Sequence, residues 1–154
     1  MKIIELKENE NVRNDMKISQ YFNQFNLLLN ELIIRDMPDK IIESINSDLE
    51  EINATLLVGK MLLRLLKKKQ LKILKLLEKE LKIVPKNYYR NLWLVLGMSA
   101  FGVPIGVAFG TSTGNMGLIG IGFPIGMGIG IALGAGMDKK AYNEGRQLNV
   151  KAKY

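Results

Sequence analysis

Residues 91–137 read NLWLVLGMSA FGVPIGVAFG TSTGNMGLIG IGFPIGMGIG IALGAGM. These 47 consecutive positions carry no charged side chain, and they hold 13 of the 15 glycines of the 154-residue chain. A helix that crosses the hydrocarbon of a bilayer needs about 20 apolar residues, so this stretch has room for two crossings and a short turn. A glycine-rich core or loop of a water-soluble protein is the alternative, but lipid is the solvent that tolerates so long an uncharged segment.

A polar cluster divides the uncharged stretch in its middle, at residues 111–115. Such a cluster of small polar residues and glycine predicts a turn. We therefore expect one helix over 92–110 and a second over 117–137. Tyr88 and Trp93 lie where the first helix would enter the membrane, a position at which aromatic side chains are common.

Charge is distributed unevenly outside this stretch. Residues 1–59 contain 6 basic and 11 acidic side chains, residues 60–90 contain 11 basic and 2 acidic, and residues 138–154 contain 5 basic and 2 acidic. Basic residues thus flank both ends of the apolar pair, while the central turn has none. The positive-inside rule predicts a multi-pass protein of the inner membrane with both termini in the cytoplasm.

The spacing of the glycines is regular within each expected helix. Residues four apart share a helix face, so each run makes a groove without side chains that another backbone can approach closely. Glycine also lies on more than one face of the second helix, which indicates two neighbours: the first helix of the same chain and a helix of a second copy. The glycines expected to pack helices and to form a homo-oligomer are Gly102, Gly106, Gly110, Gly122, Gly126, Gly130 and Gly134, with a further set at Gly120, Gly128 and Gly136.

This pattern over residues 97–137 resembles the glycine-zipper proteins, among which are small bacterial proteins with a two-pass, glycine-rich hairpin. The resemblance implies self-association. Several such proteins are channels, pores or membrane-disrupting toxins, and others are anchored scaffolds.

Pro104 and Pro124 fall inside the two expected helices, each within a Pro-Ile-Gly repeat. Proline removes a backbone donor and kinks a helix. The two prolines are therefore hinge candidates in a bundle that opens, and static kinks that improve packing are the alternative. Polar side chains that are candidates to line a pore are Ser99, Thr111, Thr113 and Asn115.

The first half of the chain shows helical periodicity. Apolar residues at steps of three and four predict a helix over 11–35, and a turn follows at 35–39, where Asp36 is a candidate cap and Pro38 suits the first helical position. A long helix is expected from Asp39 to Val84, with an apolar seam typical of a coiled coil or helical bundle. The seam residues are Ile45, Leu49, Ile52, Leu56, Gly59, Leu63, Leu66, Gln70, Ile73 and Leu77.

A basic face runs along the end of this long helix. Its members recur at steps of three or four and include Lys68, Lys72, Lys75, Lys79, Lys82 and Lys86, with Lys67 and Lys69 expected to broaden it. Three interpretations remain open: a solvated face near the acidic first part of the chain, attraction to anionic lipid head groups, and binding of an acidic regulatory ligand. A nucleic-acid strand is the least favoured ligand because the nearby tyrosines suit the bilayer interface better.

The missing residue types exclude much chemistry. Without Cys or His, the chain has no Ser-His-Asp or Cys-His nucleophile and no thiolate or imidazole zinc site. The carboxylate groupings Glu50–Glu51 and Asp36/Asp39 lie at positions typical of solvated charges, and no phosphate-binding glycine motif occurs. We therefore expect no enzyme, no catalytic residue, no metal and no cofactor.

The combined expectation is an all-α protein in three parts. Residues 1–85 form a cytoplasmic helical hairpin or coiled coil, residues 86–137 a transmembrane hairpin, and residues 138–154 a cytoplasmic basic tail. The favoured function is a homo-oligomeric channel or membrane-permeabilising protein, such as a bacterial defence or toxin effector, with a helical sensing module. The alternative is a membrane-anchored scaffold that does not conduct.

Overall fold

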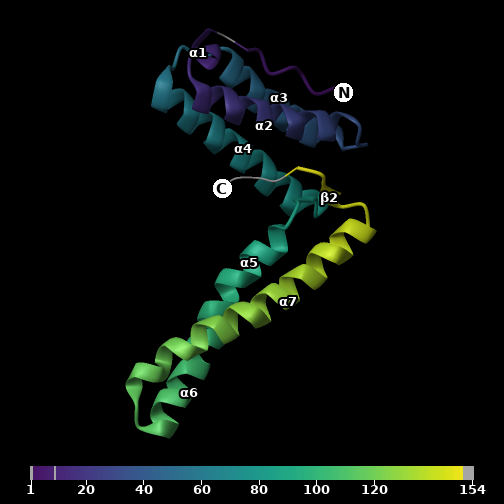
Figure 1. Ribbon diagram of the computed structural model, residues 1–154. Helices are drawn as coiled ribbons and strands as arrows, with labels where there is room; N and C mark the ends of the chain where they lie inside the picture. The colour runs from purple at the N-terminus through teal and green to yellow at the C-terminus, as the bar shows by residue number, and fades with distance from the viewer. Residues whose placement is uncertain (1, 9, 151–154) are drawn as a thin grey trace. The chain divides into compact units, whose positions relative to one another are not determined.

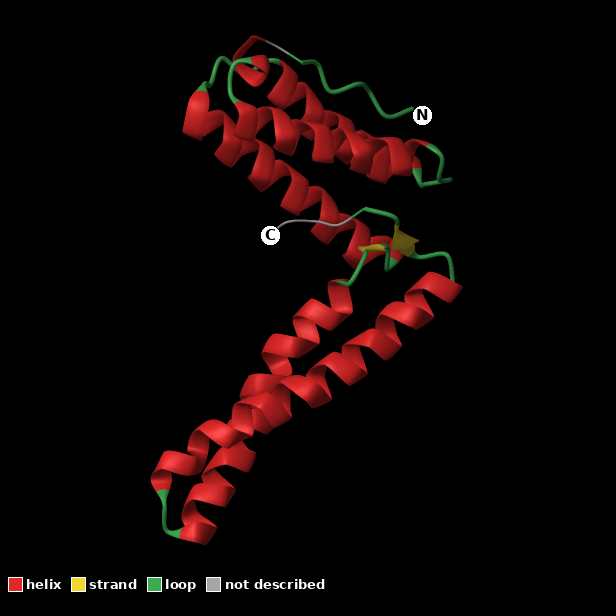
Figure 2. Cartoon of the chain, viewed as in Figure 1, coloured by secondary structure: helices red, strands yellow, loops and turns green. Residues whose placement is uncertain are grey.

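The computed structural model describes residues 2–8 and 10–150, and the chain divides into two compact units (Figure 1). The helical unit contains the described residues up to Pro85 and from Leu148 onward, and the hairpin unit is Lys86–Gln147. Regular structure is almost entirely helical (Figure 2), which confirms the helical fold class. Strands β1 (Val84–Pro85) and β2 (Gln147–Leu148) pair in a two-stranded sheet that no sequence pattern predicted.

The helical unit is built from α1 (Glu10–Arg13), α2 (Met16–Ile33), α3 (Asp39–Asn53) and α4 (Gly59–Leu81). Helix α4 packs against both α2 and α3. Their apolar stripes meet in one core, whose fully buried side chains include Phe25, Leu28, Leu32, Ile45, Leu49, Leu66, Ile73 and Leu77. Among the described residues this unit therefore contains three long packed helices and the short α1, in place of the two-helix hairpin expected from the sequence.

The expected single helix from Asp39 to Val84 is wrong, because α3 ends at Asn53 and α4 begins at Gly59. Gly59 has a φ of +55°, a conformation that L side chains rarely adopt. The seam residue Leu56 lies in this break and is 94% exposed, so it does not join the core. The apolar periodicity resumes in α4 at Leu62, which is buried.

The turn before α3 lies where the sequence placed it, but its cap differs. Pro38 is the residue that precedes the helix and Asp39 is the first helical residue, so Asp36 does not cap the helix. By contrast, α2 has a side-chain cap: the Asp15 carboxylate accepts hydrogen bonds from the backbone N–H groups of Lys17 and Ile18. Such caps satisfy N–H groups that have no partner within the helix.

The hairpin unit has two helical arms joined by a turn at Gly114, which has a φ of +66°. The first arm comprises α5 (Tyr88–Gly97), the π-helical segment η1 (Met98–Gly102) and α6 (Val103–Thr113). The second comprises the 3₁₀ segment η2 (Met116–Ile121) and α7 (Gly122–Asn143). Both arms are longer than the expected spans 92–110 and 117–137.

Each arm is long and apolar enough to cross a membrane. The first has 26 residues and the second 28, which at about 1.5 Å per residue exceeds the roughly 30 Å thickness of the hydrocarbon. Only 17% of the apolar window of each arm is buried, whereas the core helix of a water-soluble protein is mostly buried.

Candidate functional site

The two arms of the hairpin meet through glycine. Every glycine at the four-residue steps is buried, and a Cβ added at six of the seven would lie 3.0 Å or less from the backbone of the other arm. At the seventh, Gly110, the nearest atom is in the side chain of Ile119, at 3.2 Å. A Cβ on Gly130 would lie 2.0 Å from the carbonyl oxygen of Trp93, and one on Gly122 would lie 2.0 Å from that of Gly102. The backbones are therefore in direct van der Waals contact.

The seven glycines expected to pack helices consequently lie between the arms of one chain. The glycines of the first arm face the second arm. Gly102 lies against Gly122, whereas Gly106 and Gly110 lie against the 3₁₀ segment. A glycine singled out by no spacing argument, Gly97, belongs to the same interface: its Cβ would lie 2.3 Å from the carbonyl oxygen of Gly126. The second set, Gly120, Gly128 and Gly136, has nothing within 4 Å and faces outward.

The π-helical segment explains why Gly97 escaped the pattern. Gly97 precedes Gly102 by five residues, not four, and the N–H of Val103 donates to the carbonyl of Met98 five residues back. One extra residue in the turn keeps both glycines on the same face. A five-residue step next to a proline was the signal that the sequence offered.

The two prolines lie beside changes of helix type, whereas the sequence predicts them inside uniform helices. Pro104 is the second residue of α6, directly after the wide π turn, and Pro124 is the third residue of α7, after the 3₁₀ segment. Each proline lies where the helix type changes. A widened or tightened turn accommodates a residue that lacks an N–H. The role of these positions as hinges stays a prediction.

The candidate pore-lining side chains are bonded to their own arms. The hydroxyls of Ser99, Thr111 and Thr113 donate to backbone carbonyls three or four residues back, at 2.8 to 3.2 Å. The side-chain oxygen of Asn115 accepts from the N–H of Gly117 at 3.0 Å and caps the 3₁₀ segment. All four residues are exposed on the single hairpin, so a lining role would require other copies.

A buried carboxylate ties the ends of the arms together. Asp138 on α7 accepts from the backbone N–H groups of Tyr89 and Arg90 on α5, both at 3.0 Å. The carboxylate therefore supplies the cap that α5 lacks, since Asn87 makes no side-chain cap bond. In the sequence, Asp138 is only the first residue of the charged segment 138–154.

Arg146 extends this polar end of the hairpin. Its Nε donates to the carboxylate of Glu144 at 2.8 Å. Hydrogen bonding to Glu144, supported by Tyr89, raises the pKa of the Arg146 guanidinium above its ordinary value. The arms thus end in hydrogen-bonded polar groups, while their middles are apolar.

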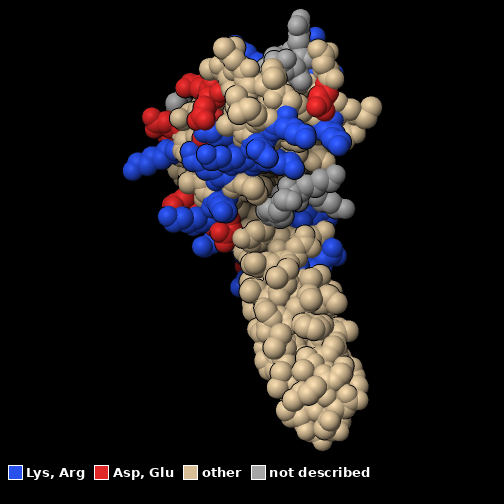
Figure 3. Space-filling model, turned by 90° about the vertical axis from the view of Figure 1, so that its left-hand side faces the viewer, with Lys and Arg blue, Asp and Glu red and all other residues tan. Residues whose placement is uncertain are grey.

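The lysines of the expected basic face differ in exposure, and they lie on α4 and in the linker that follows it. Lys68, Lys72, Lys75, Lys79 and Lys82 are exposed, and Lys86 is exposed in the hairpin unit. On the side drawn in Figure 3, lysine and arginine side chains form a band across the helical unit. Lys69 is not part of this face, because it is only 7% exposed.

Lys69 belongs to an ionic cluster with α3, in which Lys69 and Asp48 are buried and Glu51 and Lys72 are exposed. Its ammonium lies 2.8 Å from the Asp48 carboxylate and also pairs with Glu51, and Lys72 lies 2.8 Å from the same Asp48 oxygen. Burial alone would raise the pKa of Asp48, but hydrogen bonds from Lys69 and Lys72 outweigh it and lower that pKa. The interpretation in which lysines lie near the acidic first part of the chain therefore holds for these two residues.

The same buried layer contains Tyr21, whose hydroxyl hydrogen-bonds to Gln70. Burial raises the pKa of Tyr21 to about 12. The ammonium of Lys67 lies 5.7 Å from the centre of the Tyr21 ring, within the range of a cation–π contact.

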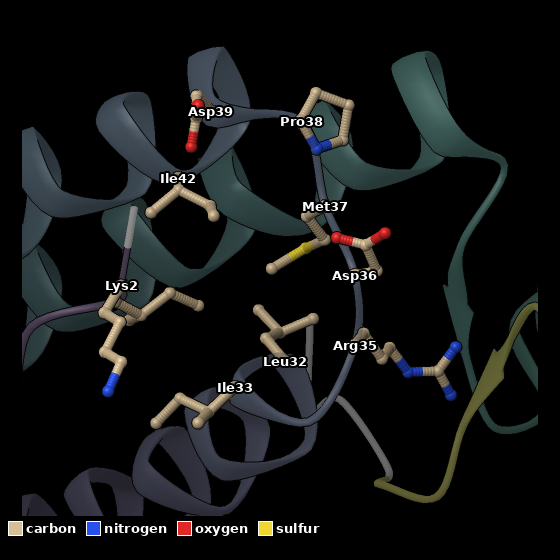
Figure 4. A pocket seen from close by; sticks show the side chains of 10 residues that line it. Lys2, Leu32, Ile33, Arg35, Asp36, Met37, Pro38, Asp39 and Ile42 are labelled. Atoms are coloured by element: carbon tan, nitrogen blue, oxygen red, sulfur yellow. The ribbon is translucent and has the colours of Figure 1, made fainter.

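The carboxylates considered for catalysis do not form a metal cluster. No group of three or more Asp or Glu that could hold a metal ion occurs among residues 2–8 and 10–150. Asp36 and Asp39 line an open pocket of about 490 Å³ at the end of α2, together with Lys2, Arg35 and apolar side chains (Figure 4).

Comparison of the chain with protein-family models, with curated proteins and with solved structures finds no match.

Proposed function

We propose that the chain is a two-pass membrane protein whose glycine-packed hairpin anchors a partner-binding helical unit at the bilayer surface. One observation carries this proposal: the hairpin uses its glycines to close its own interior, and its large apolar side chains face outward. Those exposed include Phe101, Phe109, Phe123, Ile125, Ile131 and Leu133. So large an apolar surface is stable in lipid and a liability in water.

The flanking charges support one orientation. Lys86 and Arg90 precede the first arm, Lys139 and Lys140 follow the second, and the turn between the arms is uncharged. By the positive-inside rule both ends of the hairpin are cytoplasmic and the turn faces outward, across the inner membrane.

The linker between the helical unit and the hairpin is short. Six residues separate Leu81 at the end of α4 from Tyr88 at the start of α5, a span of at most about 25 Å. The linker lysines Lys82 and Lys86 are thus within reach of anionic head groups, each contributing on the order of 1 kcal/mol when close to the surface.

Self-association with membrane permeabilisation is the second candidate function. The outward glycines Gly128 and Gly136 favour it, because no described residue lies within 4 Å of a Cβ placed there and a second copy could approach. The hydroxyls of the arms give it less support, since their protons are already donated within their own helices.

Fractionation and a membrane-potential dye test both candidates in one expression experiment. The anchor predicts that the protein stays with the membrane after alkaline carbonate extraction and that cells keep their potential. Depolarisation that disappears in the Gly128→Leu, Gly136→Leu variant, with the hairpin intact, would establish the second candidate. Release of the protein by carbonate would contradict both.

A further inference from the structure

The first described residues form an extended strap on the helical unit. This N-terminal strap, residues 2–8, runs alongside α3 (Figure 1). Leu6 is only 7% exposed, and Ile3 and Ile4 pack against the core of the unit. The strap therefore lies in a groove whose walls are α2 and α3.

Two asparagines of α3 hold the backbone of the strap. Asn46 accepts from the N–H of Ile4 at 2.9 Å and donates to the carbonyl of Lys2 at 2.9 Å. Asn53 accepts from the N–H of Lys7 at 2.8 Å and donates to the carbonyl of Glu5 at 3.0 Å. Each amide thus uses its donor and its acceptor on one peptide segment.

The two clamps are in register with an extended chain. Asn46 and Asn53 are seven residues apart, which is about 10.5 Å along a helix. The strap positions that they contact are offset by three residues, which is about 10 Å along an extended backbone. Because only N–H and C=O groups are contacted, any segment that adopts this backbone meets the same partners.

The groove is wider than the strap. A pocket of about 310 Å³ lies on the α2 side, where it is lined by Asn26, Leu29 and Asn30, and one of about 500 Å³ lies on the α3 side beside Glu50. At the Lys2 end, the pocket of Figure 4 continues the groove toward the start of α3. These hollows leave room for side chains larger than those of the strap.

We propose that the α2–α3 groove is a binding site for an extended peptide of a partner protein, with the strap as its resident competitor. The strap defines the pattern that fits: two apolar residues, any residue, a third apolar residue, and lysine at both ends. Acidic Glu50 and Asp39 at the rim carry the charge opposite to those lysines. This inference rests on the proposed function in one respect: the peptide would belong to the partner that the anchored helical unit binds.

A partner peptide must displace the strap, which competes for the groove as part of the same chain. A strap joined to the unit acts at an effective concentration in the millimolar range, so it hides the groove from dilute peptide. The apparent affinity for added peptide equals the intrinsic affinity scaled by the fraction of open grooves. Weakening the strap must therefore tighten the binding of a peptide in trans.

A direct binding measurement tests the proposal on the full chain in detergent micelles. The probe is the fluorescent peptide Lys-Ile-Ile-Glu-Leu-Lys-Glu with blocked ends. We expect at least tenfold tighter binding by the strap variant Ile4→Ser, Leu6→Ser than by the wild type. Adding Asn46→Ala and Asn53→Ala to that variant should weaken binding at least tenfold, whereas Asn23→Ala, an exposed change on α2, should leave it unchanged.

Two further measurements keep the outcome independent of folding. The probe N-methylated at the residue equivalent to Ile4 should bind at least tenfold more weakly, because it lacks the donor to Asn46. In an otherwise wild-type chain, Glu5→Cys with Glu50→Cys should form a disulfide that excess probe slows, since the chain has no other cysteine. Equal binding by both probes, or a disulfide rate indifferent to probe, would overturn the proposal whatever the topology in the membrane.

Discussion

The hairpin and the helical unit are packed on opposite principles. Between the arms, backbone meets backbone because the side chains are missing, as at Gly126 and Gly130. In the helical unit, large side chains such as Phe25 and Leu66 are fully buried in the interior. The hairpin should therefore be sensitive to added atoms and the helical unit to removed ones, and substitutions of both kinds test this contrast.

The largest effect is expected for Gly126→Val. Its Cβ would lie 2.4 Å from the carbonyl oxygen of Gly97 and 2.5 Å from the N of Gly102, so the arms must separate. We expect the free energy of unfolding to fall by more than about 4 kcal/mol. Unfolding by detergent titration, monitored by the fluorescence of the single tryptophan, Trp93, measures this change.

Gly128→Val is the matched control, since nothing lies within 4 Å of that position. Its unfolding should resemble that of the wild type. Equal sensitivity at the two positions would show that the arms do not interlock through Gly126.

Removing atoms should damage the helical unit next most strongly. Leu66 is fully buried, so Leu66→Ala leaves a cavity and should cost about 2–5 kcal/mol in urea unfolding followed by circular dichroism. The equivalent trimming on the hairpin, Val95→Ala, removes a side chain that is 62% exposed and should change little. A small effect at Leu66 would contradict the assigned core.

The ionic cluster makes the stability of the helical unit depend on pH. The pKa of Asp48 is lowered on folding, so its contribution is present above the ordinary aspartate range, near 4, and is lost as the pH falls through the folded pKa. Lys69, whose pKa is raised, contributes below its ordinary value and loses that contribution as the pH rises through the folded pKa.

Asp48→Ala should lower the free energy of unfolding at neutral pH by about 3 kcal/mol, because Lys69 would stay buried with fewer partners. The free energy of unfolding of this variant should also fall less steeply at acid pH. Thermal unfolding between pH 2 and 8 measures both effects. If the stability of the variant fell with acid pH as steeply as that of the wild type, the pH dependence would belong to other carboxylates.

The smallest effect is expected at the cap of the hairpin. Asp138→Ala removes two hydrogen bonds to the start of α5 and should cost about 1–2 kcal/mol. Hydrogen exchange at the amides of Tyr89 and Arg90 should quicken about tenfold. The exposed neighbour Lys139→Ala should leave both rates unchanged, and a similar quickening there would remove the special role of Asp138.

Periodicity predicted most helices because burial and helix repeat coincide, as in the seam from Ile45 to Ile52 and again from Leu66 to Leu77. It missed the break at 54–58, where apolar residues continue without a helix. It also placed Lys69 in the exposed face. Lys69 lies between the buried residues Leu66 and Ile73, and it faces Asp48, which lies beside buried Leu49. The available signal was therefore a pair of opposite charges within two apolar stripes that face each other.

Contacts between distant segments were harder to predict from local spacing. Nothing near Asn46 or Asn53 indicates that their amides would hold residues 2–8, and nothing near Asp138 indicates that it would cap a helix 48 residues earlier. The glycine pattern was readable because it repeats, yet it could not say which face would be used within the chain. The added residue of the π turn hid Gly97 from the count.

Single-cysteine labelling of intact cells tests the central claim, that the hairpin crosses the bilayer, most directly. The natural chain has no cysteine, so Thr113→Cys, Ser19→Cys and Lys151→Cys each report one site. A membrane-impermeant maleimide should label only Thr113→Cys from outside, and the other two only after the cells are permeabilised. Equal protection or equal labelling of all three sites would contradict a hairpin that spans the membrane.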